Sequence, residues 1–288
     1  MKALVTGGAG FIGTNLIKRL LKDGHEVVSI DNYSTGKKEN EQDGCLYYDY
    51  DLSYNYVRDD EYDVIYHLAA LPRIQPSFDD PVKTFNSNVL STLHILEYAR
   101  KNDIKVVYAD SSSVHGNKYV NPYTFTKYNG AELCRMYSEV YDLPVSICRF
   151  YNVYGPLQET EGEYCTVGGI FERQYKNSES LTITWDGEQR RDFTHVGDIV
   201  DGLVKTGNEY FKECEEFELG SGKNYSINEL VKFFGDKYPI NRIPKRDGEM
   251  RETLCTDTHA HDLLNWKPTR DLEDYIRSFV ETERFLNE

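Results

Sequence analysis

Ser111, Tyr123 and Lys127 are residues of the types that exchange protons with an alcohol, and they fall within one short segment. Asn121-Pro122 is typical of a helix N-cap and first turn, which predicts Tyr123 and Lys127 one turn apart on the same helical face. A free phenol has a pKa near ~10, and a neighbouring ammonium group favours its phenolate. The segment therefore predicts a general base, Tyr123, that acts on an alcohol. The alternative is an ordinary polar loop and helix, because a tyrosine four residues before a lysine is common.

A glycine-rich turn near the N-terminus favours the catalytic interpretation over the ordinary polar loop. A predicted strand at 2–6 leads into Gly7, Gly10 and Gly13, and a helical pattern follows. Between a strand and a helix, such glycines permit a tight turn and a close backbone approach to a pyrophosphate, while the helix N-terminus supplies amide donors. The turn predicts a dinucleotide site.

Asp31 ends the second predicted strand. A carboxylate at this place accepts hydrogen bonds from both ribose hydroxyls and repels a 2′-phosphate, which favours NAD over NADP. Lys37 and Lys38 lie nearby and keep NADP open as a smaller alternative.

Alternating strand and helix patterns must position these residues. Strands are predicted at 2–6, 26–30, 45–49, 63–69, 105–110 and 144–150, and the clearest helices at 10–22, 81–101 and 122–142. This alternation predicts an α/β fold, a Rossmann-type doubly wound parallel sheet with a smaller C-terminal α/β substrate-binding lobe. We expect residues 1–152 to form the NAD-binding domain, with 186–208 returning to it, and 153–185 and 209–288 to form the second lobe. Ser111, Asn88 and Asn152 then share the carboxyl edge of the sheet.

Composition excludes several classes of function. The formal charge of −15 over 288 residues argues against nucleic acid or an anionic membrane as partner. The six cysteines are scattered without metal-ligand spacing, so we expect no metal and reduced thiols. No apolar run is long enough for a membrane span, and the N-terminus enters a strand directly. The sequence predicts a cytoplasmic protein.

Several motifs in the same order as in a known family make a specific match. They are TGGAGFIG, SIDN, YHLAA, NVLSTL, the serine run, YTFTK, RFYNVYGP, RRDFTHVGD and KRDGEMR. The chain resembles the extended short-chain dehydrogenases/reductases, in their NAD-dependent nucleotide-sugar epimerase/dehydratase branch, and most of all the UDP-glucose (UDP-galactose) 4-epimerases. The resemblance covers nearly the whole chain.

The resemblance implies roles for individual residues. Ser111, Tyr123 and Lys127 match the catalytic group, in which the lysine also holds the nicotinamide ribose. The cofactor set it implies is Gly7, Gly10, Phe11, Ile12, Gly13, Asp31, Asn32, Asp51, Leu52, Leu68, Ala69, Ala70, Asn88, Tyr123, Lys127 and Tyr151. The implied substrate set is Ser111, Ser112, Asn152, Arg191, Arg246 and Glu249, of which Asn152 and Arg191 match the diphosphate contacts and Arg246 and Glu249 the nucleotide-ribose contacts.

The residues after Ser111 favour one reaction within the branch. Family dehydratases place Asp-Glu directly after the catalytic Ser/Thr, and decarboxylases keep a glutamate there, whereas this chain has Ser112 and Ser113. We therefore expect epimerisation of a nucleotide-diphosphate sugar at C4, through a transient 4-keto intermediate, with UDP-glucose and UDP-galactose as substrates. The alternatives are a dehydratase with a relocated acid, a net dehydrogenase or 4-keto reductase, and a non-catalytic NAD-binding protein.

The chain departs from the family pattern at three places. The stretch between Gly116 and Tyr123 is shorter than usual and removes a loop beside the cofactor. Thr184 stands where an aromatic residue commonly stacks on the base; either Trp185, which follows it, takes over the stacking, or the base is not uracil. Thr253 is small where a large residue excludes N-acetyl groups, which predicts tolerance of N-acetylhexosamines.

Two further expectations concern a side chain and a surface. Arg73, in the loop after YHLAA, is either a surface arginine or a partner for a sugar 6-carboxylate, which would make the protein a uronic-acid epimerase. The helices at 81–101 and 122–142 carry more apolar residues than a sheet needs as cover. Relatives pair such helices across a two-fold axis, so we expect a homodimer through a four-helix bundle, with a monomer as the alternative.

Overall fold

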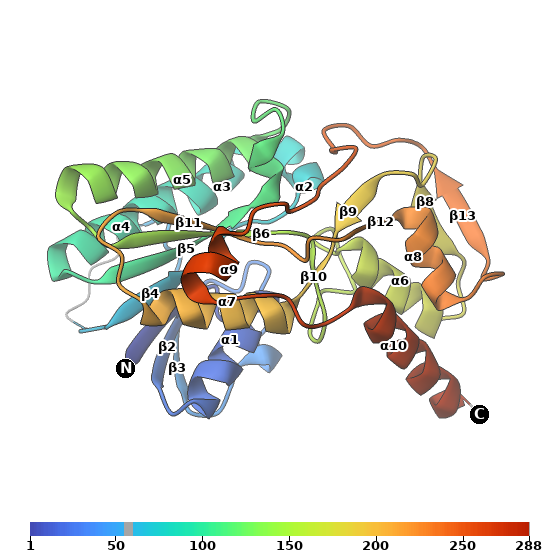
Figure 1. Cartoon of the computed structure of the whole chain (residues 1–288), viewed down its shortest axis with the longest axis horizontal. Coiled ribbons are helices and arrows are strands. Elements are labelled where there is room, and N and C mark those ends of the chain that lie inside the picture. Colours follow the sequence, from blue (N-terminus) through green and yellow to red (C-terminus); the bar gives the residue numbers. More distant parts are fainter. Residues whose placement is uncertain (55–59, 288) are drawn as a thin grey trace.

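A seven-stranded parallel sheet forms the centre of the larger lobe (Figure 1). The computed structural model describes residues 1–54 and 60–287. In spatial order the strands are β11 (Glu215–Leu219), β6 (Val145–Phe150), β5 (Lys105–Ser111), β4 (Val64–His67), β1 (Lys2–Thr6), β2 (Glu26–Asp31) and β3 (Cys45–Asp49). All neighbouring pairs run parallel, as the buried apolar runs predicted.

Helices cover both faces of this sheet, which confirms the doubly wound fold (Figure 1). One face carries α1 (Phe11–Lys22) and α7 (Val196–Asn208), with Leu16, Leu20 and Leu203 in its core. The other carries α4 (Ser91–Asn102) and α5 (Pro122–Tyr141), with Ile95 and Ala131 in its core. Within the segment 186–208, α7 packs against the large sheet, whereas β9 (Arg190–Asp192) pairs with β12 (Asn224–Ser226).

The second lobe is smaller and has its own core. Its elements are β8 (Leu181–Thr184), β9 (Arg190–Asp192), β12 (Asn224–Ser226), β13 (Ile240–Ile243), α6 (Val167–Lys176), α8 (Ile227–Phe234) and α10 (Leu272–Asn287). Phe171, Leu230 and Phe234 are buried where α6, α8 and α10 meet. Ser226 and Glu229 form a reciprocal capping box that starts α8.

The remaining elements are short. They are the parallel pair β7 (Val153–Tyr154) and β10 (Thr194–His195), the helices α2 (Ile74–Asp79), α3 (Pro81–Phe85) and α9 (His259–Leu264), and the single turns η1 (Lys38–Asn40), η2 (Asn86–Leu90) and η3 (Ser112–His115). No helix among the described residues is long and apolar enough to span a bilayer.

Two elements differ from the sequence-based prediction. β11 joins the large sheet beside β6, whereas residues 209–288 were assigned to the second lobe. Its sequence, EEFEL, resembles an exposed segment, but Glu216 and Glu218 are held at the sheet edge by ion pairs with Arg149. The helix predicted at 81–101 contains a π-helical turn, η2, which inserts Asn88 into the protein interior.

Candidate active site

A cavity of about 980 Å³ lies at the carboxyl ends of β1, β2, β4 and β5, and residues of the second lobe close its other side. This is the edge where open α/β sheets bind ligands. The structure brings to it nearly every residue that the sequence nominated: Gly7, Gly10, Phe11, Ile12, Gly13, Asp31, Asn32, Asp51, Leu52, Leu68, Ala69, Ala70, Arg73, Ser111, Ser112, Tyr123, Lys127, Asn152, Arg191, Arg246, Glu249 and Thr253.

The glycine-rich turn has the geometry that a dinucleotide requires. Gly7 has φ +72°, and a Cβ at this residue would lie 2.9 Å from the Cα of Ala69. At Gly10 a Cβ would meet only the Gly7 carbonyl oxygen, at 3.3 Å, so the remaining space beside this backbone belongs to the cavity. The turn then leads into the N-terminus of α1, where Gly10 is the N-cap and makes no side-chain cap. These residues fit the pyrophosphate of a dinucleotide.

Asp31 is held in place by two backbone amides. Its Oδ2 accepts from the Ala9 N–H at 2.9 Å and its Oδ1 from the Tyr33 N–H at 2.8 Å, while burial raises the pKa of this carboxyl group. Lys37 pairs with Glu159 at 2.9 Å and Lys38 approaches Asp49 at 3.9 Å. Both lysines therefore have carboxylate partners, and the arrangement fits NAD, with Asp31 facing the ribose, better than NADP.

At the reacting end, β5 and α5 bring together the three residues of the proton-transfer group. Ser111 ends β5 and caps η3, where its Oγ accepts from the Ser113 N–H at 3.3 Å. Asn121 caps α5 by accepting from the Thr124 N–H at 2.7 Å, so Tyr123 stands in the first turn. One turn later, the buried Lys127 Nζ donates to the Ala109 carbonyl at 2.8 Å. The predicted helix start and the common face of Tyr123 and Lys127 are thus present.

The pKa values of Tyr123 and Lys127 differ from the expectation that the ammonium group of Lys127 is the main cation favouring the Tyr123 phenolate. Burial raises the pKa of Tyr123, and the main opposing influences are a hydrogen bond with Ser111 and the positive charge of Arg73. Burial lowers the pKa of Lys127 to about 8, against the charge of Asp110. The ammonium group of Lys127 is therefore balanced by Asp110, and the strongest cationic influence on Tyr123 comes from Arg73.

A second group of polar residues lines the cavity where the chain after β6, β9 and the segment 246–253 meet. Asn152, with φ +26°, donates through Nδ2 to the Asp192 carbonyl at 2.9 Å and to Thr253 Oγ1 at 3.2 Å. Arg191 Nη2 lies 3.9 Å from Glu249 Oε2. Arg246 is exposed at the cavity rim. Residues up to 101 positions apart in sequence thus form one polar wall.

Three nominated residues do not line the cavity. Asn88 is buried behind it, where its amide accepts from the Leu71 N–H at 2.7 Å and donates to the Leu71 carbonyl at 3.2 Å. Tyr151 is turned into the protein and donates to Glu218 at 2.9 Å. Trp185 is 45% exposed, and the cationic groups of Lys245 and Arg251 lie 4.7 and 4.8 Å from the centre of its ring. These positions are corrected: the first two support the site from behind, and Thr184, not Trp185, faces the cavity.

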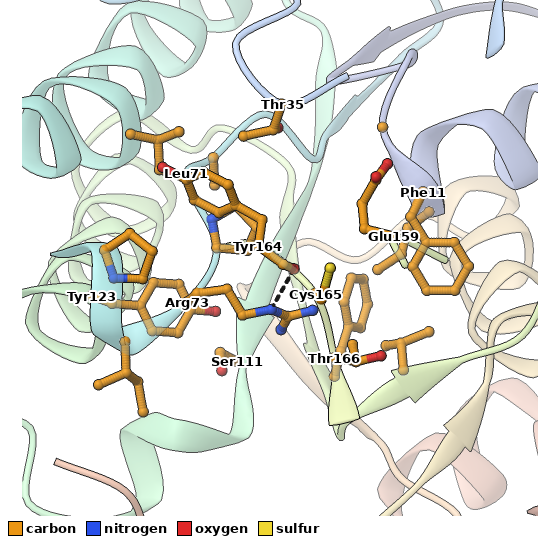
Figure 2. A pocket seen from close by; sticks show the side chains of 18 of the residues that line it. Phe11, Thr35, Leu71, Arg73, Ser111, Tyr123, Glu159, Tyr164, Cys165 and Thr166 are labelled. Carbon is orange, nitrogen blue, oxygen red and sulfur yellow. Dashed lines mark hydrogen bonds between the residues drawn. The ribbon is translucent and has the colours of Figure 1, made fainter. Parts of the chain in front are cut away.

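The sequence did not nominate one segment that covers the cavity. Residues 162–168, together with Glu159, lie along its side between the two lobes. In Figure 2, Glu159, Tyr164, Cys165 and Thr166 lie across from Tyr123 and Ser111. At this segment the sequence showed only that the alternation of strands and helices stops after Phe150, in a stretch rich in glycine and glutamate. Such irregular segments carry no periodicity that would place their side chains.

The place beside the shortened loop is filled from the second lobe. Met250 lies 3.3 Å from the position that a Cβ on Gly116 would take. Asn121 Nδ2 donates to the Gly248 carbonyl at 3.3 Å, and Gln75 Nε2 donates to the Asp247 carbonyl at 2.9 Å. The segment 247–250 therefore closes the wall next to the start of α5.

Comparison with known proteins agrees with this geometry. Residues 3–220 match the model of the NAD dependent epimerase/dehydratase family. A UDP-glucose 4-epimerase from Mycolicibacterium smegmatis is 33% identical over 312 residues, which cover 98% of each chain.

Solved structures show the same likeness over the full length. The UDP-glucose 4-epimerase of Thermotoga maritima, in complex with UDP-glucose, superposes with a TM-score of 0.90 at 28% identity over 100% of both chains. A UDP-glucuronic acid 4-epimerase variant from Bacillus cereus, in complex with NAD and UDP-4-deoxy-4-fluoro-glucuronic acid, gives 0.89 at 29% identity over 99% of this chain and 100% of that one. The fold and the NAD cofactor predicted from the sequence are confirmed, and the chain belongs to the NAD dependent epimerase/dehydratase family.

Proposed function

We propose that this chain interconverts the C4 epimers of a nucleotide-diphosphate sugar, with UDP-glucose and UDP-galactose as substrates and their N-acetylhexosamine counterparts also accepted. One observation carries the proposal. Tyr123, Ser111 and Lys127 face a cavity wide enough for a dinucleotide and a sugar nucleotide, and Ser112 and Ser113 occupy the positions where elimination would need carboxyl groups.

Tyr123 is the group that takes the proton from the sugar O4 and later returns it. Ser111, hydrogen-bonded to Tyr123, orients that hydroxyl group. Bound NAD supplies the oxidising and then the reducing equivalent at C4, so the cofactor is restored in each turnover. Lys127, fixed by the Ala109 carbonyl, is placed to hold the nicotinamide ribose.

Epimerisation also requires that the 4-keto sugar turn over while its nucleotide stays bound. Arg191, Asn152 and Arg246 line the cavity and grip the diphosphate and ribose in this proposal. The small side chain of Thr253 leaves room for an N-acetyl group.

The test is the interconversion of 4-epimers by the NAD-loaded enzyme over a panel of UDP-activated hexoses, N-acetylhexosamines and hexuronic acids. Tyr123→Phe should lower turnover by roughly a hundredfold or more. Tyr128→Phe, one residue beyond Lys127 and outside the cavity, is the matched control and should retain activity. Undiminished turnover by Tyr123→Phe would refute the assignment, and a 4-keto-6-deoxy product would identify a dehydratase.

A further inference from the structure

Arg73 is held in the reaction cavity by several independent constraints. Its backbone adopts φ +107° at the start of α2, a conformation that costs a non-glycine residue free energy and often marks a functional position. Its Nε donates to the Tyr164 carbonyl at 2.8 Å. Two residues earlier, Asn88 clamps both backbone polar groups of Leu71. The Tyr164 carbonyl therefore holds the guanidinium group, while Asn88 holds the backbone two residues before it.

Figure 2 shows where this side chain points. Arg73 extends between Tyr123 and the segment that carries Tyr164 and Cys165, and the hydroxyl end of Tyr123 is directed toward it. Ser111 lies on the same side of the cavity. The cation thus stands at the reacting end, whereas Arg191 and Arg246 belong to the nucleotide end.

The charge of Arg73 has no counter-charge in the described part of the chain. Within residues 1–54 and 60–287, no carboxylate lies within ion-pairing distance, and the Tyr164 carbonyl is its only hydrogen-bond acceptor. Burial lowers the pKa of the guanidinium group, and the titratable groups that oppose this are Tyr123 and Cys165. Arg73 is partly buried, and a cation removed from water without a carboxylate partner favours a negative charge nearby.

The other charged groups around Tyr123 are already balanced. The titratable groups that face it are Arg73, Asp110, Lys127 and Tyr108, and Cys165 faces Arg73. Asp110 is shared between Lys127 and Arg149, with Arg149 Nε at 2.8 Å. Arg73 is thus the cation at this end whose charge is not already neutralised by a carboxylate.

We propose that Arg73 is a positioning residue for proton transfer, whose unpaired guanidinium group stabilises the conjugate base of Tyr123 alongside Ser111 and Lys127. The inference rests on the proposed role of Tyr123 as the base. When Tyr123 loses its proton, the phenolate becomes the counter-charge that Arg73 otherwise lacks. The guanidinium cation and the phenolate anion then stabilise each other. An opposite charge at close range lowers a pKa by roughly one to three units.

The test compares Arg73→Gln, Arg73→Lys and the control Arg173→Gln, all loaded with NAD. Arg173 also lines the cavity and donates to a backbone carbonyl, that of Thr160, but from α6. Ionisation of Tyr123 is followed by ultraviolet difference titration against Tyr123→Phe, which requires no substrate. We expect it to move about one to three pH units upward in Arg73→Gln, and to stay near its original value in Arg73→Lys and Arg173→Gln.

Turnover provides the second readout. In Arg73→Gln the acid limb of the kcat/KM profile should shift upward by the same amount, with about a tenfold loss per unit at neutral pH and recovery at higher pH. An unchanged Tyr123 titration in Arg73→Gln would overturn the inference. So would a loss confined to KM for sugars that carry a carboxylate, because Arg73 would then bind substrate. If no sugar nucleotide is turned over, the proposed function fails while the titration still decides the role of Arg73. Should Arg73→Gln not bind NAD, Arg73→Lys and an Arg73→Met variant replace it in the titration.

Discussion

The Nε atom of Arg149 donates to the Oδ2 atom of Asp110 at 2.8 Å, and the two side chains are only 7% and 0% exposed. The same guanidinium group pairs with Glu216 at 3.0 Å and also with Glu218. Asp110 immediately precedes Ser111, so this network fixes the end of β5 at the catalytic edge. Arg149 is therefore the common cation that joins β5, β6 and β11.

Removing Arg149 should destabilise the fold more than any exposed ion pair does. Arg149→Met leaves buried carboxylates without their partner, which should lower the free energy of unfolding by about 3–5 kcal/mol. Arg277→Met, which breaks the exposed pair with Glu273, should cost less than about 1 kcal/mol. Urea unfolding monitored by circular dichroism gives both values. Similar losses in the two variants would show that the network contributes little.

The buried Lys127 should make stability depend on pH. Its pKa is about 8 in the folded chain, below the ordinary value of 10.5, so the unfolded chain binds more protons between these values. Relative to Lys127→Met, the wild type should therefore gain stability as pH rises from about 8 to about 10.5, by up to about 3 kcal/mol. The measurement is urea unfolding of both proteins across this range at constant NAD. A constant difference would mean that Lys127 titrates normally.

Thr253 should control the size of the sugar substituent. Its Oγ1 accepts from Asn152 Nδ2 and from the Asp192 N–H, both at 3.2 Å, and it faces the cavity. In Thr253→Tyr a ring would occupy this space, so turnover of N-acetylhexosamine substrates should fall at least about tenfold relative to hexoses. Thr253→Ser keeps the hydroxyl group and should preserve the ratio. If Thr253→Tyr leaves the ratio unchanged, the predicted tolerance does not depend on this residue.

One face of α3 and α5 should mediate dimerisation. Phe85, Phe125, Met136 and Val140 are 36–60% exposed, and the three on α5 recur at helical spacing. We expect a dimer in light scattering at micromolar concentration, and a monomer for the double variant Met136→Lys/Val140→Glu. The control is Leu263→Glu, on α9, where the leucine is 46% exposed. A wild-type monomer, or a dimer that survives the double variant, would contradict the four-helix prediction.

The sequence predicted those parts of the fold that depend on local patterns. Buried apolar runs located six strands of the large sheet, and Asn121-Pro122 located the start of α5 within one residue. The sequence did not predict strand β11. Its glutamates are accommodated in the sheet by ion pairs with Arg149 and Arg135, which are distant in sequence. The periodic pattern of apolar residues does not reveal ion pairs between residues that are distant in sequence.

In the candidate site, too, the sequence predicted what local motifs determine and missed what depends on contacts between distant residues. Residues carried by a motif, such as Gly7, Asp31 and Tyr123, line the cavity as predicted. Asn88 was predicted to bind the cofactor but does not line the cavity, because a π-helical turn directs its amide to the Leu71 backbone. The position of Arg73 was expected near the sugar, but its lack of a counter-charge depends on contacts that only the three-dimensional arrangement reveals.

The segment 247–250 links Arg246, which is expected to hold the nucleotide, to the wall of the cavity beside the start of α5. It continues directly from Arg246 and contains Glu249, while Gly248 and Met250 contact Asn121 and Gly116 beside the start of α5. A tether of this length cannot move at one end without displacing the other. In the proposed function, the few residues that hold the nucleotide thus also line the space in which the sugar turns.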